Sequence, residues 1–571
     1  MKRNIDHRRL GRLRQDQGEL ANHVIDEFAA GRLSRRDFIR RASVVGISVP
    51  VLGAILEACG SSSSNSSSSS TSTSSGAASS PAAAGGATIR VGITTPAASI
   101  NPVTVADQGG LDMLAQTGEY LVLSDQTLNV KPVLATSWSP NSTATVWTFK
   151  IRQGVKFHNG APLTADDVVY SMKLYAGPGS AALSAFAGVL KPAGVQKVDD
   201  FTVSFNLEAP NGNFPYLVSS DNYNTIIIPN GTAPTSWQSS FVGTGPFVLG
   251  TYTAKSGATF TRNESYWGTK ALPSGTTFTF YDTQPPSILA LTGGTIDVLG
   301  QFSVSGGQAL LAGGYNVIKL NSSAHRELSM RCDQPPFTDP RVRQAVALTL
   351  NRPEIVSALF KGDAVVGNDS PFAPIFPSTD TSVPQRVQNI AMAKSLLSAA
   401  GHPNGFTTSL ATENIQEIPE LAQIMAQSAQ AIGVKINLNI EDQSKYYGNF
   451  EFGGSDWLDA TMSLVDYGHR GVPNVFLTAP LETTNSKTGT GPWNSAHFAN
   501  SQYDGLVAQY IAAPDISSQK TVAGKIEQLL LNETPIIYPY FYNYLTATAM
   551  GVGGVYPTAI GHIFLYNATK S

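Results

Sequence analysis

Cysteine is scarce in this sequence, which has two cysteines, Cys59 and Cys332, among 571 residues. They lie in such different stretches that we expect no disulfide, and we expect each to act alone. Charged residues are also few, at 14% with a net charge of −3. The sequence therefore lacks the basic face that a nucleic-acid partner requires. Its length allows two or more domains, and its 42% hydrophobic content is typical of a globular protein with a large core.

Motifs for catalysis and metal binding are absent as well. The sequence contains no G-x-S-x-G, no H-E-x-x-H and no C-x-x-C pattern. Histidines such as His158, His402 and His497 are scattered and do not have the spacing of zinc ligands. A secreted hydrolase is thus an alternative without a visible nucleophile, and we expect neither enzymatic activity nor a cofactor.

The N-terminal 58 residues resemble an export signal. Arg35 and Arg36, followed by Phe38 and Ile39, fit the twin-arginine pattern. The apolar run at 42–56 is too short for a comfortable membrane span and suits a signal peptide. It ends in Leu-Glu-Ala before Cys59, which resembles a lipobox and predicts that Cys59 is lipidated. The alternative is an uncleaved anchor with an incidental cysteine, because a glutamate is unusual inside a lipobox.

The stretch at 59–87 is made almost wholly of Ser, Thr, Ala and Gly after the cysteine, so it cannot bury a core. We expect a disordered tether with a reach of about 30 Å. Residues 1–58 hold 11 basic and 7 acidic residues, which leaves 27 basic and 34 acidic residues in the cleaved chain. A mildly acidic surface is compatible with cationic or zwitterionic ligands.

The stretch at 147–170 combines two strand patterns, a turn and a helix start. Residues 147–152 and 155–158 alternate apolar with polar side chains, which predicts strands, and Asn159-Gly160 is a strong two-residue turn signal. Thr164 is a good N-cap, and Asp166 and Asp167 fit the first helical turn. A helix-cap role explains both aspartates, and the alternative is a paired-carboxylate site.

Together with the upstream run KPVLATSW at 131–138, this stretch resembles the family 5 extracellular solute-binding proteins, the peptide, oligopeptide and nickel receptors of bacterial ABC importers. The resemblance extends over residues 88–571 with motifs in the expected order. They are GTGPF at 243–247, RNESYW at 262–267, PPFTDPRVRQAV at 335–346, AKSLLSAAGHPNGF at 393–406 and NETPIIYP at 532–539. Asp339 is predicted to cap a helix, and Arg343 to form a structural ion pair.

The resemblance implies an α/β fold of the periplasmic-binding-protein type II, with two lobes, a hinge and an extra inserted domain. The implied boundaries are 1–58 for the signal peptide, 59–87 for the tether, 88–125, 236–321 and 536–571 for lobe I, 126–235 for the inserted domain and 322–535 for lobe II. The implied function is capture of a solute between the lobes and its delivery to a permease. We expect an extracytoplasmic, lipid-anchored monomer.

Seven residues are candidate ligand contacts. The family's aspartate that pairs with a peptide α-ammonium group matches Asp466, in the run SLVDYG at 463–468, and an aspartate buried at a lobe interface must find a cation or donors. The alternative is a structural salt bridge, for which Arg470 is the candidate partner. The other six candidates are Tyr467, Gln443, Trp457, Asp107, Gln108 and Tyr223.

The ligand itself is left open. A small peptide or another amine-bearing solute is the default, although two tryptophans of oligopeptide receptors are missing, one of them replaced by Gln443. His469 lies three residues beyond Asp466, so a nickel-type chelate is an alternative, as is a sugar-like solute. A signalling or chaperone-like surface protein on the same fold is a further alternative. Cys332 is expected to be a buried small hydrophobe.

Overall fold

The computed structural model describes residues 86–97, 100–233, 241–485 and 490–571. Residues Ala83–Ser571 form one compact unit, and the fold below is that of this unit. Arg35, Arg36, Cys59 and most of the predicted tether lie outside the described residues.

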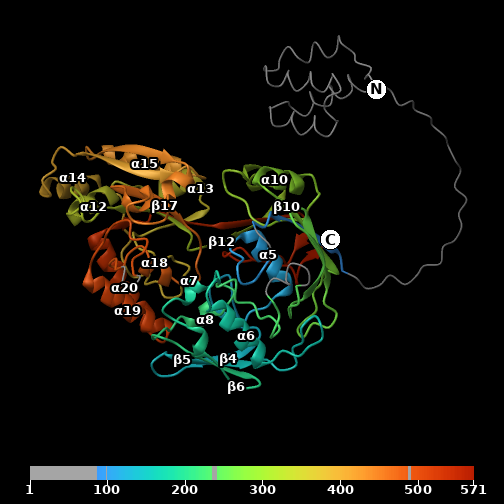
Figure 1. The fold of residues 1–571 in the computed structure, drawn as a ribbon. Helices are drawn as coiled ribbons and strands as arrows, with labels where there is room; N and C mark the ends of the chain where they lie inside the picture. The colour runs from blue at the N-terminus through green and yellow to red at the C-terminus, as the bar shows by residue number, and fades with distance from the viewer. Residues whose placement is uncertain (1–85, 98–99, 234–240, 486–489) are drawn as a thin grey trace, which may run out of the picture. The chain divides into compact units, whose positions relative to one another are not determined.

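The first large sheet has seven strands in the order β12-β20-β11-β1-β10-β9-β8. Its central strand β1 pairs in parallel with β10 on one side and with the short β11 on the other, while the outer strands are antiparallel. We call this sheet and the helices beside it the first lobe (Figure 1). Its elements are β1 (Thr88–Thr94), α5 (Gln108–Thr117), β8 (Phe247–Thr253), β9 (Gly257–Arg262), β10 (Gly275–Tyr281), α10 (Gln284–Thr292), β11 (Val298–Leu299), α11 (Gln308–Leu311), β12 (Tyr315–Leu320) and β20 (Tyr544–Ala549).

The second large sheet also has seven strands, in the order β14-β19-β13-β17-β15-β16 with β18 paired to β13. We call this sheet and its helices the second lobe (Figure 1). Its strands are β13 (His325–Met330), β14 (Ala364–Val366), β15 (Thr407–Glu413), β16 (Lys435–Glu441), β17 (Met462–Tyr467), β18 (Ile536–Ile537) and β19 (Tyr540–Tyr542). Its helices are α12 (Pro340–Ala347), α13 (Arg352–Phe360), α14 (Ile390–Ala399), α15 (Ile418–Gln430), α16 (Gln443–Tyr447), α17 (Asp456–Asp459), α18 (Asn474–Thr478), α19 (Ser501–Ala512) and α20 (Ile516–Glu533).

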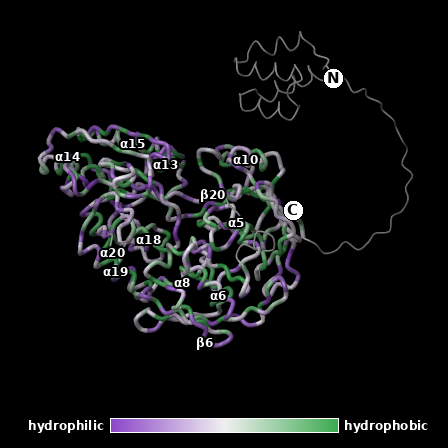
Figure 2. The backbone as a smooth tube through the Cα atoms, in the orientation of Figure 1, coloured by the Kyte–Doolittle hydropathy of each residue, from purple (hydrophilic) through white to green (hydrophobic). Residues whose placement is uncertain are grey.

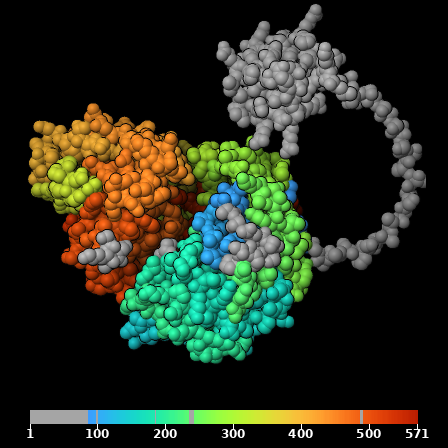
Figure 3. Space-filling model, viewed as in Figure 1, coloured from blue at the N-terminus to red at the C-terminus, as the bar shows by residue number. Residues whose placement is uncertain are grey.

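A four-stranded antiparallel sheet, in the order β4-β5-β7-β6, forms a third layer with α6. In the space-filling view its residues gather as one cyan to green body, distinct from the yellow to orange second lobe (Figure 3). Its elements are β4 (Ala135–Pro140), β5 (Val146–Ile151), α6 (Ala165–Tyr175), α7 (Leu183–Phe186), a 3-10 turn (Pro192–Gly194), β6 (Val195–Asp199), β7 (Thr202–Asn206) and α8 (Phe214–Leu217). Short pairs complete the fold: β2 (Val122–Ser124) with β3 (Val130–Pro132), β21 (Val552–Gly553) with β24 (Thr569–Lys570), and β22 (Tyr556–Pro557) with β23 (Ile563–Phe564).

The helix start at Thr164 is confirmed in detail. Thr164 and Asp167 form a reciprocal capping box, in which the Thr164 amide donates to Asp167 Oδ2 at 2.8 Å. Asp166 forms an exposed ion pair with Lys197 at 2.8 Å. Asp167 thus has the predicted helix-cap role, and Asp166 lies in the first turn as predicted, with its charge paired to Lys197.

The strand predicted at 155–158 is wrong. This segment contains one isolated bridge, between Lys156 and Pro162. The Asn159-Gly160 turn is present, with the Phe157 amide donating to the Ala161 carbonyl at 2.9 Å. The Leu163 amide also donates to the Val155 carbonyl at 2.9 Å, so the segment forms a short turn with a single bridge and no strand.

The chain crosses between the two large sheets twice. It passes from β12 to β13 between Leu320 and His325, and it returns from β19 to β20 at Asn543. The return was expected at 536, but β18 and β19 pair with strands of the second sheet, so residues 536–542 belong to the second lobe. Two adjacent crossings of this kind make a two-stranded hinge.

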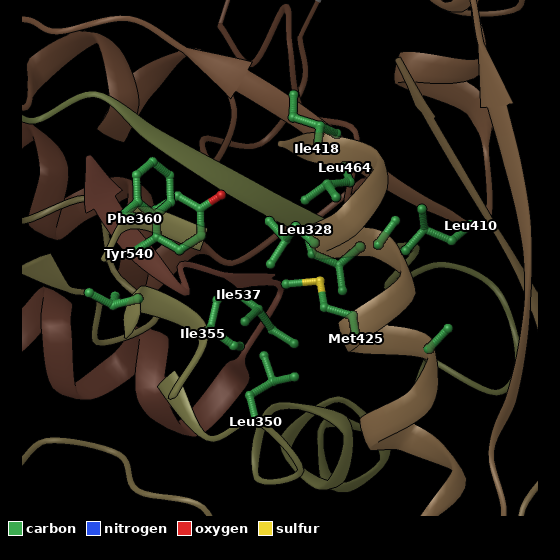
Figure 4. Packing of buried hydrophobic residues seen from close by; sticks show 14 of the residues in the cluster. Leu328, Leu350, Ile355, Phe360, Leu410, Ile418, Met425, Leu464, Ile537 and Tyr540 are labelled. Atoms are coloured by element: carbon green, nitrogen blue, oxygen red, sulfur yellow. The ribbon is translucent and has the colours of Figure 1, made fainter. Parts of the chain in front are cut away.

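The core of the second lobe forms where α15 packs on the sheet. Figure 4 shows Leu328 and Leu464, from two paired strands, beside Ile418 and Met425 of the helix. These side chains are almost fully buried, and burying each contributes about 1.5–3 kcal/mol. The helix places these residues on one face through its 3.6-residue period.

Polar and apolar residues are interleaved over short distances along the tube in Figure 2. Within the part of the chain that the structure describes, none of the helices has the length and apolar character needed to traverse a membrane.

A buried ion pair holds the hinge side of the second lobe together. Asp369 accepts hydrogen bonds from Arg352 at 2.7 and 2.8 Å and from Arg386 at 2.6 Å. It also accepts from the Tyr538 amide at 3.1 Å, just before β19. The carboxylate is fully buried, so removing its charge leaves two guanidinium groups without their counter-ion.

Asp369→Asn is therefore expected to lower the free energy of unfolding by about 3–5 kcal/mol, measured by urea denaturation. The matched control is Asp166→Asn, because Asp166 pairs with Lys197 at the surface, and its loss should cost no more than about 1 kcal/mol. Equal effects of the two substitutions would contradict the structural role of Asp369.

Asp221 is a second buried carboxylate, and it forms no ion pair with a cation of the described chain. A Cβ atom at Gly471 would lie 2.0 Å from Asp221 Oδ2, so the carboxylate packs directly on the Gly471 backbone. Burial, with the charge of Asp125 adding to it, raises the pKa of Asp221 from 3.8 to about 7. The folded state therefore retains the proton at pH values where the unfolded chain has lost it.

The contribution of Asp221 to stability should be lost as the pH rises from about 4 to about 7, because only the unfolded state gains from ionising this carboxylate there. Asp221→Asn removes this contribution, so on going from pH 4.5 to pH 8 its unfolding free energy should rise relative to that of the wild type. Urea titrations at both pH values measure the difference. Asp442→Asn changes an exposed carboxylate, so its unfolding free energy should vary with pH as that of the wild type does. If the unfolding free energy of Asp221→Asn also varied with pH as the wild type's does, the raised pKa of Asp221 would be refuted.

Candidate ligand-binding cleft

Asp466 lies near the end of β17 and is 26% exposed, so solvent reaches it. It stands directly opposite Arg326 in the antiparallel pairing of β17 with β13. Arg326 Nη1 donates to Asp466 Oδ1, and the Tyr542 hydroxyl donates to the same oxygen at 3.0 Å. Among the described residues, Asp466 Oδ2 has no hydrogen-bond partner, so one carboxylate oxygen remains available.

Arg326 is the centre of this polar cluster, and its side chain is fully buried. Its Nη2 donates to Gln416 Oε1 at 2.7 Å and to Glu417 Oε2 at 3.3 Å, and its Nε lies 2.9 Å from Glu417 Oε1. The guanidinium stacks on the Tyr542 ring at 4.5 Å. Desolvation disfavours its charge, but Asp466, Tyr542 and Glu417 outweigh that and raise the pKa of Arg326. The cluster contains two carboxylates and one guanidinium, which leaves it a formal charge of −1.

The predicted salt-bridge partner of Asp466, Arg470, is wrong, and the partner is Arg326. The Arg470 backbone is fixed by Ser323, whose hydroxyl accepts from the amide at 2.9 Å and donates to the carbonyl at 2.8 Å. The Arg470 guanidinium donates to the His469 carbonyl at 2.8 Å and, within the described chain, forms no ion pair with a carboxylate. Burial lowers the pKa of Arg470, and the charge of Asp466 acts on it in the opposite sense, so Arg470 is a second cation near Asp466.

Tyr467 and Trp457 belong to an aromatic cluster beside Asp466. Tyr467 stacks on Trp493 with ring centroids 5.7 Å apart, and Trp457 is 4% exposed and packs edge-on against Tyr447 at 5.3 Å. Phe450, stacked on Tyr447, is 65% exposed. The solvent-facing aromatic surface is therefore that of Tyr447 and Phe450, with Trp457 behind it.

Gln443 is exposed at the start of α16 and donates to Glu413 Oε2 at 2.7 Å. The Tyr447 hydroxyl donates to the other oxygen, Glu413 Oε1, at 2.9 Å. Glu413 thus fixes Gln443 and Tyr447 relative to one another.

The first-lobe candidates surround the start of α5. Asp107 is the N-cap of α5 and accepts from the Gly110 amide at 2.9 Å. Gln108 donates through Nε2 to the Tyr544 hydroxyl, at the first residue of the returning hinge strand. Tyr223 is partly exposed, and its carbonyl accepts from the Tyr120 hydroxyl at 3.0 Å. Contact of any of the seven candidates with a ligand remains a prediction.

A cavity of about 290 Å³ lies between the two large sheets. None of the described residues that line it is a tryptophan or a histidine. The first lobe supplies the end of β1 at Thr94, the segment 281–284 and the segment 301–305. The second lobe supplies the end of α13, the start of α15 and the hinge residue Tyr542. Tyr542 therefore joins the cavity to the Asp466 cluster.

Sequence reasoning did not identify Arg326, Glu417, Tyr542 or the cavity. The strand at 325–330 reads HRELSM, and its burial, which the sequence does not show, is what makes Arg326 require carboxylate partners.

His469 is buried, and its Nδ1 accepts from the Ser323 amide at 3.0 Å. Burial lowers the pKa of His469 to about 3. Among the described residues, no three His, Cys, Asp or Glu side chains are grouped closely enough to hold a metal ion. Cys332 is a free, partly buried thiol, and burial raises its pKa to about 11.

Comparison with known proteins agrees with this architecture. Residues 129–469, more than half of the chain, match the family described as bacterial extracellular solute-binding proteins, family 5 Middle. The dipeptide-binding protein DppE of Bacillus subtilis is 26% identical over 483 residues, covering 77% of this chain and 84% of the relative. The heme-binding protein A of Haemophilus influenzae is 26% identical over 452 residues, covering 72% and 78%.

Solved structures share the fold. HbpA2 from Haemophilus parasuis superposes with a TM-score of 0.74 at 23% identity, covering 85% of this chain and 100% of that one. The unliganded open form of the periplasmic murein tripeptide-binding protein MppA gives a TM-score of 0.72 at 22% identity, covering 84% and 97%. The predicted type II fold with two lobes is confirmed, and the chain belongs to the family 5 bacterial extracellular solute-binding proteins.

Proposed function

We propose that this protein is a monomeric, lipid-anchored substrate-binding protein of an ABC importer and that its ligand carries an amino group. A small peptide is the default ligand. The observation that carries the amine assignment is Asp466 Oδ2, which has no partner among the described residues and belongs to a side chain that is 26% exposed, in a cluster of Arg326, Asp466 and Glu417 whose own formal charge is −1. A cationic group at this oxygen would balance the cluster.

The pairing with Arg326 does not remove Asp466 from the proposed site. The buried Arg326 guanidinium donates to Asp466 Oδ1 and so fixes the Asp466 carboxylate. Its single positive charge cannot neutralise both Asp466 and Glu417. A carboxylate held in place by donors loses less side-chain entropy when a ligand binds. The second acid, Glu417, shares the same guanidinium, so these three groups keep a formal charge of −1, which the neighbouring Arg470 partly offsets.

The names of several relatives fit this chemistry. They include a dipeptide-binding protein and the glutathione-binding protein GsiB of Pectobacterium atrosepticum, and dipeptides and glutathione both carry a free amino group. The heme-binding relative indicates that the family framework accommodates other ligands, so the amine assignment depends on the Asp466 cluster itself.

The hinge supplies the binding mechanism. The two crossings near residues 321–324 and at Asn543 are short, and Tyr542 lies immediately before the second one. A ligand that contacts Asp466 and first-lobe residues such as Gln108 would favour the closed arrangement of the lobes, which is an ordinary population shift. The permease would then recognise the closed form.

Asp466→Asn tests the amine contact because it removes the charge and keeps an acceptor for Arg326. We expect a mixed dipeptide pool to bind the wild type about 10- to 150-fold more tightly than the same pool with acetylated amino groups, the worth of one charge-assisted hydrogen bond. In Asp466→Asn, the ratio of the affinities for the free and the acetylated pool should fall towards one. Calorimetric titration measures both affinities.

Asp442→Asn is the matched control, since Asp442 is an exposed second-lobe carboxylate with no side-chain cap bond, and it should retain the full preference. If acetylation does not affect binding to the wild type, the ligand is not recognised through its amino group and the proposal fails.

The lipid anchor is tested separately with Cys59→Ser. Metabolic labelling with a radioactive fatty acid should label the wild type, and the protein should sediment with membranes, because two acyl chains give durable anchoring. Cys59→Ser should be unlabelled and soluble, whereas Cys332→Ser should behave as the wild type. Labelling of Cys59→Ser would exclude Cys59 as the lipidation site.

A further inference from the structure

The cavity between the lobes has walls of two chemical kinds. Apolar side chains form one part, with Phe302 at 2% and Leu545 at 1% exposure, beside Leu359 and Phe360 at the end of α13. The rings of Phe360 and Tyr542 lie nearly parallel, 6.4 Å apart with an interplanar angle of 4°. These groups form an apolar surface that suits an alkyl chain.

The charged side chains among the described residues that line the cavity are all acidic. The lining contains two carboxylates, Asp282 and Glu417, and the described residues that line the cavity include no lysine, arginine or histidine. Asp282 is exposed at the end of β10, and one of its oxygens accepts from the Thr95 hydroxyl at 2.7 Å. Its other oxygen has no partner among the described residues.

Asn543 is an independent indication that a ligand donates a hydrogen bond in this cavity. It lines the cavity at the point where the hinge strand returns, and its Oδ1 atom is buried without a hydrogen-bond partner in the described chain. A buried acceptor without a partner destabilises the fold, so a donor supplied by a ligand would relieve that cost.

We infer that this cavity is a subsite for a basic side chain of the ligand, such as that of lysine or arginine. The alkyl stem would lie along Phe302, Leu359 and Phe360, and the cationic head would meet Asp282 and Asn543 Oδ1. The volume of about 290 Å³ accommodates one such side chain. This inference rests on the proposed function, since the subsite adjoins the Asp466 cluster through Tyr542.

The assignment specifies the ligand more closely than the proposed function does. A ligand with one amino group at Asp466 and a basic side chain in the cavity carries two cationic centres. Glu417 contributes to both places, because it pairs with Arg326 and also lines the cavity. We therefore assign the protein to small basic peptides or related diamino solutes.

The test compares peptides that differ by one terminal amine. Lys-Ala, Ala-Lys and Ala-Lys-Ala, with their norleucine and glutamate counterparts, are titrated calorimetrically against the wild type. At least one lysine peptide should bind about 10-fold or more tightly than its norleucine counterpart, the worth of one charged hydrogen bond. Equal binding of every lysine and norleucine pair would overturn the subsite.

Charge reversal provides the sharper test. Asp282→Lys should abolish the lysine preference and improve binding of the glutamate counterpart, which a merely structural role for Asp282 would not produce. Asp442→Lys changes the net charge of the protein equally, away from the cavity lining, and should keep the lysine preference. Retention of the lysine preference in Asp282→Lys would also overturn the subsite.

The outcomes separate the two proposals. If the norleucine peptides bind as well as the lysine peptides and acetylation of the α-amino group weakens all of them, the subsite fails and the amine-binding function stands. If none of the peptides binds, the peptide-binding function fails and the subsite fails with it.

Discussion

The pairing of one buried guanidinium with two carboxylates is the constraint on which the cleft depends. Arg326 is in the second strand position after the chain enters the second lobe, and its burial would be prohibitive without Asp466 and Glu417. The three groups come from β13, from β17 and from the start of α15. Their charges thus fix a strand pair and a helix terminus relative to one another, and they leave an excess negative charge facing the cleft.

The hinge connects this electrostatic arrangement to motion. Tyr542 donates to Asp466, stacks under Arg326 and lines the cavity, and the next residue, Asn543, is the point of return to the first sheet. A ligand that occupies the cleft therefore contacts the strand that carries the crossing. Binding energy gained there would be coupled directly to the relative position of the lobes.

Local features of the fold could be predicted from the sequence, and long-range pairings could not. The capping box at Thr164 and the cap at Asp339 depend on neighbouring residues, and both are confirmed. Arg343 pairs with Glu533 at 3.3 Å, which confirms its structural role. The partner of Asp466 is 140 residues away, and only the register of β13 against β17 brings Arg326 opposite it. The return crossing was misplaced because the pairing of β18 and β19 with the second sheet depends on strands far away in the sequence, which the run at 536–549 does not reveal.

The proposed recognition of an amino group by Asp466 can be measured by native mass spectrometry of the freshly purified protein, followed by release and amine labelling of any retained ligand. We expect a retained small molecule that takes up label at one or more amino groups and that is lost from Asp466→Asn. A retained ligand without an amino group would show that Asp466 does not bind an amine.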